Sequence, residues 1–209
     1  MNKYLKITLG ILGVIVLGIG LLVVTFVLEM KPDKDREEQV RSQAEQYLED
    51  KFNDSFEIYD TLYDNMGNFE FEYAAKVRSE DNIEFLVYFN EEKKRMEDSY
   101  IAEKWARNLY NGLNPYLKNN ISDIEEVFVM FDDEVGSIYN LSYKNPGEYK
   151  DYEVSATVLI TLSRNLNDND QNLLNDVTDY LKTELKVKHA TVEINSSKNH
   201  KLNGLVSQF

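Results

Sequence analysis

The chain of 209 residues contains no cysteine and has a formal net charge of −14 at pH 7. Without cysteine there are no disulfides, no thiolate catalysis, no cysteine-ligated metal centre and no lipid-modified N-terminal cysteine. The negative charge argues against binding to nucleic acid, because phosphates would repel the domain. Aromatic residues are abundant, with 14 Tyr and 10 Phe, and proline is scarce, which is typical of a folded chain.

The first predicted element is a membrane anchor over residues 7–28, which contain no charged side chain. At about 1.5 Å per residue, this helix would span about 33 Å, enough to cross the hydrocarbon core of a bilayer. No small-x-small cleavage pattern follows it, which favours an uncleaved signal anchor over a signal peptide. Lysine and arginine counts on its two sides are nearly balanced. The short tail of residues 1–6 nevertheless predicts a cytoplasmic N-terminus, with residues 29–209 outside.

After the anchor, hydrophobic periodicity predicts helices and strands in turn. Apolar residues at helical spacing predict helices over residues 33–52, 98–117 and 168–185. Alternating apolar residues predict half-buried antiparallel strands between them. The expected strands are residues 56–63, 69–77, 83–89, 125–131, 136–143, 152–162, 190–194 and 202–209.

The predicted order is therefore α-βββ-α-βββ-α-ββ after the transmembrane helix. This is an α+β fold in which helices pack on one face of antiparallel sheets. Each helix ends on a similar signature, Tyr47-Leu48, Tyr116-Leu117 and Tyr180-Leu181. Two interpretations stay open. A duplicated α-plus-hairpin unit would give similar halves over residues 33–118 and 119–209, whereas the signature is also a common end for an amphipathic helix.

The sequence contains no recognisable catalytic or metal-binding motif. The two histidines, His189 and His200, lack the context of a metal site or a catalytic base. Residues 168–172 resemble the start of a calcium loop, but Leu173 stands where that loop needs glycine. The acidic run 132–134 could bind a cation, although a polar hairpin turn is the preferred interpretation. We therefore expect no enzymatic activity, no cofactor and no metal.

One predicted surface is a candidate for binding another protein. The face of the first three strands that points away from the helices carries tyrosine and glutamate side chains. Tyrosine offers a large contact area at a low entropic cost, and glutamate beside it suits a basic partner. The alternative is an ordinary solvated sheet face. The candidate residues are Glu57, Tyr59, Tyr63, Glu70, Glu72, Glu84, Leu86 and Tyr88.

Residues 40–118 resemble small exported proteins of Bacillus-type Gram-positive bacteria. In those proteins a helix ending in Tyr-Leu precedes β-strands, as Tyr47-Leu48 does here, and a tryptophan-bearing helix follows. They are membrane-anchored proteins or lipoproteins, so the resemblance implies a place in the cell envelope but no activity. This chain departs from them in having an apolar helix where they carry a lipidated cysteine. The motif that carries the resemblance is Tyr100-Ile101-x-x-x-Trp105-x-x-x-Leu109 through Leu113-x-Pro115-Tyr116-Leu117.

In arrangement alone, the chain also resembles membrane-anchored immunity proteins, which neutralise toxins outside the cell. The leading hypothesis is a single-pass membrane protein whose extracytoplasmic domain binds another protein, which would be basic, without catalysis. One alternative is an immunity protein that neutralises a secreted toxin. Others are a structural subunit of a secretion, conjugation or other envelope complex, and a cell-wall enzyme.

Overall fold

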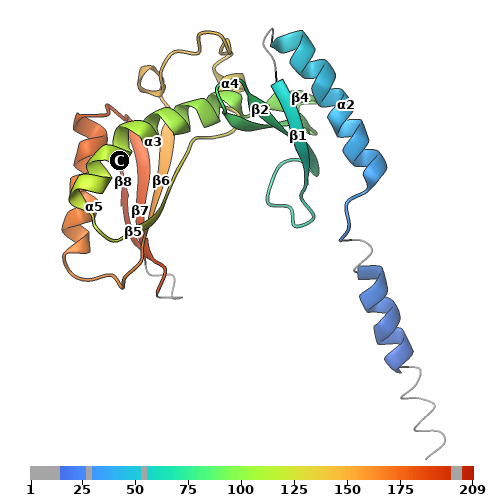
Figure 1. Ribbon diagram of the computed structural model, residues 1–209, viewed down its shortest axis with the longest axis horizontal. Helices are drawn as coiled ribbons and strands as arrows, with labels where there is room; N and C mark the ends of the chain where they lie inside the picture. Colours follow the sequence, from blue (N-terminus) through green and yellow to red (C-terminus); the bar gives the residue numbers. More distant parts are fainter. Residues whose placement is uncertain (1–14, 27–29, 53–55, 199–203) are drawn as a thin grey trace, which may run out of the picture.

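The computed structural model describes residues 15–26, 30–52, 56–198 and 204–209. Residues 15–26 form a helix that leads toward the rest of the chain (Figure 1). No helix in these described ranges is both long and apolar enough to cross a membrane. The predicted tail, and both ends of the predicted anchor over residues 7–28, lie outside the described residues.

The first half of the described chain contains α2 (Lys34–Lys51), β1 (Phe56–Tyr63), β2 (Tyr73–Ser79), β3 (Glu84–Asn90) and β4 (Arg95–Asp98). The four strands form an antiparallel sheet in chain order, and α2 packs along it (Figure 1). The Asp33 carboxylate caps α2 by accepting a hydrogen bond from the Asp35 N–H at 2.9 Å. Val40, Ala44 and Leu48, four residues apart, form the face that α2 buries against the sheet.

The second half contains α3 (Tyr100–Asn120), β5 (Ile124–Met130), α4 (Val135–Ile138), the 3₁₀ turn η1 (Tyr149–Asp151), β6 (Ser155–Leu162), α5 (Asp170–Thr183), β7 (His189–Ser196) and β8 (Leu205–Gln208). These four strands form a second sheet in the order β5-β6-β7-β8. β6 and β7 pair in parallel, whereas the other two pairs are antiparallel. α5 lies in the crossover that returns the chain to the same end of the sheet.

Helix α3 connects the two sheets and supplies the centre of the core (Figure 1). Trp105, Leu109 and Leu113 recur every four residues, and each is fully buried. The Trp105 indole N–H donates a hydrogen bond to the Gly147 carbonyl at 3.1 Å, and its ring stacks on Tyr152. Buried residues of both sheets belong to one continuous cluster around this helix. The α+β class and the helices predicted over residues 33–52, 98–117 and 168–185 are thus confirmed, with small shifts of their ends.

The predicted strand over residues 136–143 is wrong. The chain forms the short helix α4 there, followed by irregular backbone. Gly136 lets this segment lie close to α3, because a Cβ atom at this position would be 3.0 Å from Cγ1 of Ile101. The Leu141 N–H then donates to the Gly136 carbonyl at 2.8 Å and closes a turn. Close packing against α3 therefore overrides the alternating sequence pattern.

Three further strand predictions need correction. Strand β4 was not expected, because three of its four residues are charged; two of them, Glu97 and Asp98, are buried through ion pairs. The strand expected over residues 69–77 begins only at Tyr73, since residues 64–72 form a loop. The expectation of antiparallel pairing throughout fails at β6 and β7. There α5 provides the long crossover that parallel strands need.

Candidate functional site

A β-bulge in β1 splits the surface that the sequence predicts for binding. The register with β2 shifts between Ile58 and Asp60, so Tyr59 is the extra residue. One extra residue reverses which side chains face each side of the sheet. Beyond the bulge, the Tyr63 ring therefore stacks on Tyr73 on the side of α2, with ring centroids 4.8 Å apart. The prediction that Tyr63 shares a face with Tyr59 is wrong.

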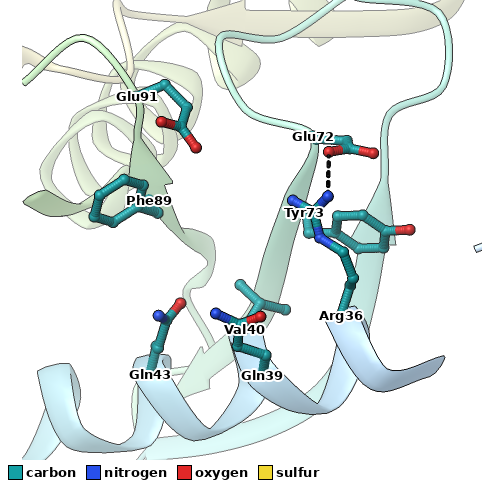
Figure 2. A pocket seen from close by; sticks show the side chains of 8 residues that line it. All are labelled: Arg36, Gln39, Val40, Gln43, Glu72, Tyr73, Phe89 and Glu91. Carbon is teal, nitrogen blue, oxygen red and sulfur yellow. Dashed lines mark ion pairs between the residues drawn. The ribbon is translucent and has the colours of Figure 1, made fainter. Parts of the chain in front are cut away.

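Glu72 also lies on the α2 side, where it borders a hollow of about 330 Å³ between α2 and β3 (Figure 2). Its carboxylate forms an ion pair with Arg36 of α2 at 3.0 Å. Charges of both signs and neutral amides line this hollow, so it favours no particular charge in a ligand. The lining residues are Arg36, Gln39, Val40, Gln43, Glu72, Tyr73, Phe89 and Glu91.

On the outer face of the first sheet, the charged side chains neutralise one another. The Arg78 guanidinium lies over the Tyr59 ring, 4.5 Å from its centroid. It forms ion pairs with Glu84 at 2.7 Å and with Glu57 at 3.5 Å. The hydrogen bond from Arg78 lowers the pKa of Glu84, and the Tyr59 hydroxyl donates to Glu84 at 3.2 Å. Three of the predicted binding residues thus have partners within the same face.

The two remaining strand residues of the predicted surface, Leu86 and Tyr88, take part in packing. Tyr88 is only 3% exposed and forms a small second core with Ala74 and Phe71, against which Leu86 packs. Burial raises the pKa of Tyr88, so its hydroxyl stays neutral at physiological pH. The expectation that Tyr88 is an exposed contact residue is wrong, because the loop that precedes β2 covers it.

That loop, residues 64–72, is organised by one buried carboxylate. Asp64 accepts hydrogen bonds from the backbone N–H groups of Met66 at 3.0 Å and Phe69 at 2.7 Å. These bonds outweigh the burial of Asp64 and lower its pKa. The Phe69 ring is 44% exposed and stacks on Phe71, which in turn contacts the Tyr88 ring at a centroid distance of 4.6 Å. A column of three rings therefore runs from the surface into the core.

Beside this column lies a groove that both halves of the chain build. It has a volume of about 550 Å³ and is enclosed by the loop 64–72 and by residues 130–134, which follow β5. Its lining consists of apolar side chains, which we call the apolar wall, and of acidic side chains. The apolar side chains are Phe69, Phe71, Tyr88, Met130 and Phe131, and the acidic ones are Glu70, Asp132, Asp133 and Glu134. We call this feature the groove.

The acidic residues of the groove differ in whether they have an ion-pair or hydrogen-bond partner. Glu134 pairs with Lys93 at 2.7 Å and accepts a hydrogen bond from the Asn90 side chain at 2.8 Å. In the described part of the chain, the carboxylates of Asp133 and Glu70 have no hydrogen-bond or ion-pair partner. Burial raises the pKa of Asp133, and the nearby carboxylates of Asp132 and Glu70 raise it further. The groove therefore contains a half-buried carboxylate without a cation beside it.

A buried ionic cluster fixes the position of residues 130–134 relative to the first sheet. Glu97 of β4 accepts hydrogen bonds from Arg95 at 2.8 Å and from the Ser137 hydroxyl at 2.9 Å. Lys93 bridges Glu97 and Glu134. Burial disfavours the charge on Glu97, but these hydrogen bonds outweigh it and lower its pKa to about 2. The cluster holds α4, and with it the acidic side of the groove, against β4.

Other polar positions singled out from the sequence have structural partners. Asp170, in the sequence that resembles a calcium loop, is buried and pairs with Arg164 at 2.6 Å. His189 lies on the surface 3.2 Å from Glu153, and His200 is outside the described residues. In the described ranges, no three or more histidine or carboxylate side chains are arranged so that they could hold a metal ion together.

No protein-family model matches the chain, and no curated protein matches it. Among solved structures, it is similar to a crystal structure of a DUF5037 family protein from Ruminococcus gnavus ATCC 29149. The sequence identity is 13% and the TM-score is 0.37, and the match covers 73% of this chain and 72% of that chain. A likeness at this level carries no argument about function.

Sequence reasoning missed the groove although it identified some of its parts. Glu70 and Tyr88 were candidates, and the acidic run 132–134 was considered as a cation site. The available signal was that this run directly follows a predicted strand, while Phe69 and Phe71 bring two aromatic rings close together in the sequence. Nothing local in the sequence indicates that these two segments meet.

Proposed function

We propose that this chain is a membrane-tethered protein whose domain outside the cytoplasmic membrane binds another protein without catalysing a reaction. The uncharged run of residues 7–28 supports the tether. The absence of a recognisable catalytic motif in the sequence supports a non-enzymatic role.

The observation that carries the proposal is the groove. It combines an exposed aromatic ring, Phe69, an exposed methionine, Met130, and carboxylates without partners in the described chain. Aromatic and methionine side chains are enriched in protein interfaces, whereas unpaired charges at the edge suit a partner of opposite sign. Because Asp64 fixes the loop in advance, little entropy is lost when a partner binds.

Site-specific crosslinking in cells that produce the full-length chain tests this proposal. A photo-reactive phenylalanine at position 69 should form an adduct with one protein partner. The same residue at position 206, in β8, is the control, because Val206 is also exposed but lies on the second sheet. Equal labelling from both positions, or no adduct from position 69, would contradict a specific binding surface there.

The tether and its orientation need a separate test. Protease added to intact protoplasts should degrade the domain, and the chain should stay with the membrane after an alkaline wash. A protected domain would reverse the proposed orientation, and release by the wash would contradict the anchor.

A further inference from the structure

The groove places an apolar wall next to carboxylates that lack a counter-charge, which is the chemistry of a site for an organic cation. On the premise that the chain binds a protein partner, we infer that the groove receives a protonated lysine or arginine side chain of that partner. The cationic head would lie between Asp133 and the aromatic column, and its alkyl stem would cover Met130.

The aromatic wall suits a cation with an apolar stem. The faces of the rings carry negative charge density, which attracts ammonium and guanidinium groups within about 6 Å. Phe69 and Phe71 stack with ring centroids 4.9 Å apart, and Phe69 keeps nearly half of its surface open. Met130 is 45% exposed and offers a flexible apolar contact for a methylene chain.

The carboxylates supply the charge complementarity. Asp133 is half-buried, and an unpaired carboxylate in such a place is unfavourable until a cation compensates it. Asp132 and Glu70 lie close enough to raise the pKa of Asp133, so their negative potential acts at the same point. Three carboxylates around one apolar wall would attract a cation and repel an anion.

The cations of the chain itself do not fill this position. None of the described residues that line the groove is a lysine or an arginine. Lys93, which pairs with Glu134 at the edge of the groove, is also held by Glu97 at 3.1 Å, so it is engaged between two other carboxylates.

On the outer face of the first sheet, the same chain shows a cation that contacts both an aromatic ring and a carboxylate. There Arg78 lies over the Tyr59 ring and pairs with Glu84. The groove has the ring and the carboxylate but no cation. A side chain from a partner would complete in the groove the interaction that Arg78 completes on the sheet.

Binding of short peptides to the full chain tests the inference. The chain would be held in nanodiscs of phosphatidylcholine, a zwitterionic lipid without net charge, so that the lipid does not attract the cationic peptides. The probes are acetyl-Gly-Gly-X-Gly-Gly-amide peptides, in which X is arginine, lysine, citrulline or norleucine. Calorimetry should give at least about fivefold tighter binding for arginine and lysine than for their neutral isosteres. Equal binding of the arginine and citrulline peptides would overturn the inference.

Matched variants separate the groove from the overall negative charge. Asp133→Asn and Phe69→Ala should each weaken binding of the arginine peptide at least about threefold. Glu125→Gln removes the same charge from the exposed part of β5 and should leave binding unchanged. Equal losses in Asp133→Asn and Glu125→Gln would show non-specific attraction and overturn the inference. Thermal unfolding of each variant verifies that it is folded.

The two proposals can fail separately. A partner that crosslinks at position 69 but binds Asp133→Asn as well as the unaltered chain would leave the protein-binding function intact and exclude the cationic contact. Selective peptide binding without any crosslinked partner would support the cation site and contradict the protein-binding function.

Discussion

Two surfaces of the molecule contain the same kinds of side chains but differ in what these side chains can do. On the outer face of the first sheet, Arg78 forms ion pairs with Glu57 and Glu84 and covers Tyr59. In the groove, the carboxylate of Asp133 lies near aromatic rings without a cation from the described chain. The difference shows that composition does not identify a binding surface. What matters is which charges already have partners after folding.

The largest effect is expected from Glu97, because it fixes one side of the groove. Replacing its buried carboxylate, Glu97→Gln, should cost about 3 kcal/mol of unfolding free energy, since Arg95 and Lys93 lose their common partner. Chemical denaturation of the full chain would measure the loss. Glu91→Gln is the control, because Glu91 pairs with Lys94 on the surface, and its replacement should change the unfolding free energy by less than about 0.5 kcal/mol.

The same carboxylate predicts a pH dependence. The pKa of Glu97 falls from an ordinary value of 4.5 to about 2 in the folded chain. A group with a lowered pKa in the folded state stabilises the fold above its unfolded pKa. Its contribution should therefore be complete above about pH 5 and be lost as the pH falls from 4.5 toward 2. Curves of unfolding free energy against pH for the unaltered chain and for Glu97→Gln should approach each other, without meeting, as the pH falls from 4.5 to 3. Parallel curves would contradict this assignment.

The next effect concerns the loop that presents Phe69. Asp64→Ala removes two hydrogen bonds to the backbone of the loop and should lower the unfolding free energy by about 2 kcal/mol. The arginine peptide should also bind more weakly, because the aromatic column loses its fixed position. Asn65→Ala, at the exposed neighbouring position, should alter neither quantity. Loss of stability with full retention of peptide binding would show that the groove does not depend on this loop.

A lysine introduced into the groove should pair with its carboxylates, as Arg78 pairs with Glu57 and Glu84 on the outer face of the first sheet. Met130→Lys places an ammonium group beside the carboxylates and should weaken the arginine peptide at least about tenfold, by occupation and by repulsion. Phe128→Lys adds the same charge two residues earlier on β5, at an exposed position that does not line the groove. Phe128→Lys should reduce binding of the arginine peptide less than twofold, because a screened surface charge changes the binding free energy by about 0.4 kcal/mol or less. Equal effects of the two variants would mean that only net charge matters.

The smallest effect on stability and binding should come from removing Arg78 from the outer face of the first sheet. Arg78→Gln removes a partly exposed cation, so its cost in stability should be less than about 1 kcal/mol. It also leaves Glu57, Glu84 and Tyr59 without their shared cation. Weak binding of the arginine peptide should therefore appear in a second site, which calorimetry would detect as a change in stoichiometry. An unchanged stoichiometry would indicate that a ring and two carboxylates need the enclosure of the groove.

The sequence predicted much of the fold but only fragments of the groove. Helix α3 was predictable because Trp105, Leu109 and Leu113 repeat at the period of an α-helix, which depends on near neighbours alone. Strand β4 was not, because three of its four residues are charged, and the burial of Asp98 against Lys51 and of Glu97 against Ser137 depends on residues that are distant in the sequence. Glu70 and Tyr88 were named for the wrong surface, since neither the bulge at Tyr59 nor the loop before β2 leaves a periodic signal.

The sequence by itself determined the acidic balance, the uncharged run of residues 7–28, the three amphipathic helices and most strands, because each follows from composition or from periodicity within a short window. Only the tertiary structure decided which side Tyr63 faces, that β6 and β7 pair in parallel, and that the loop 64–72 meets residues 130–134. These features depend on contacts between residues far apart in the chain. Such contacts also decide which carboxylates are neutralised, and so which surface remains available for a partner.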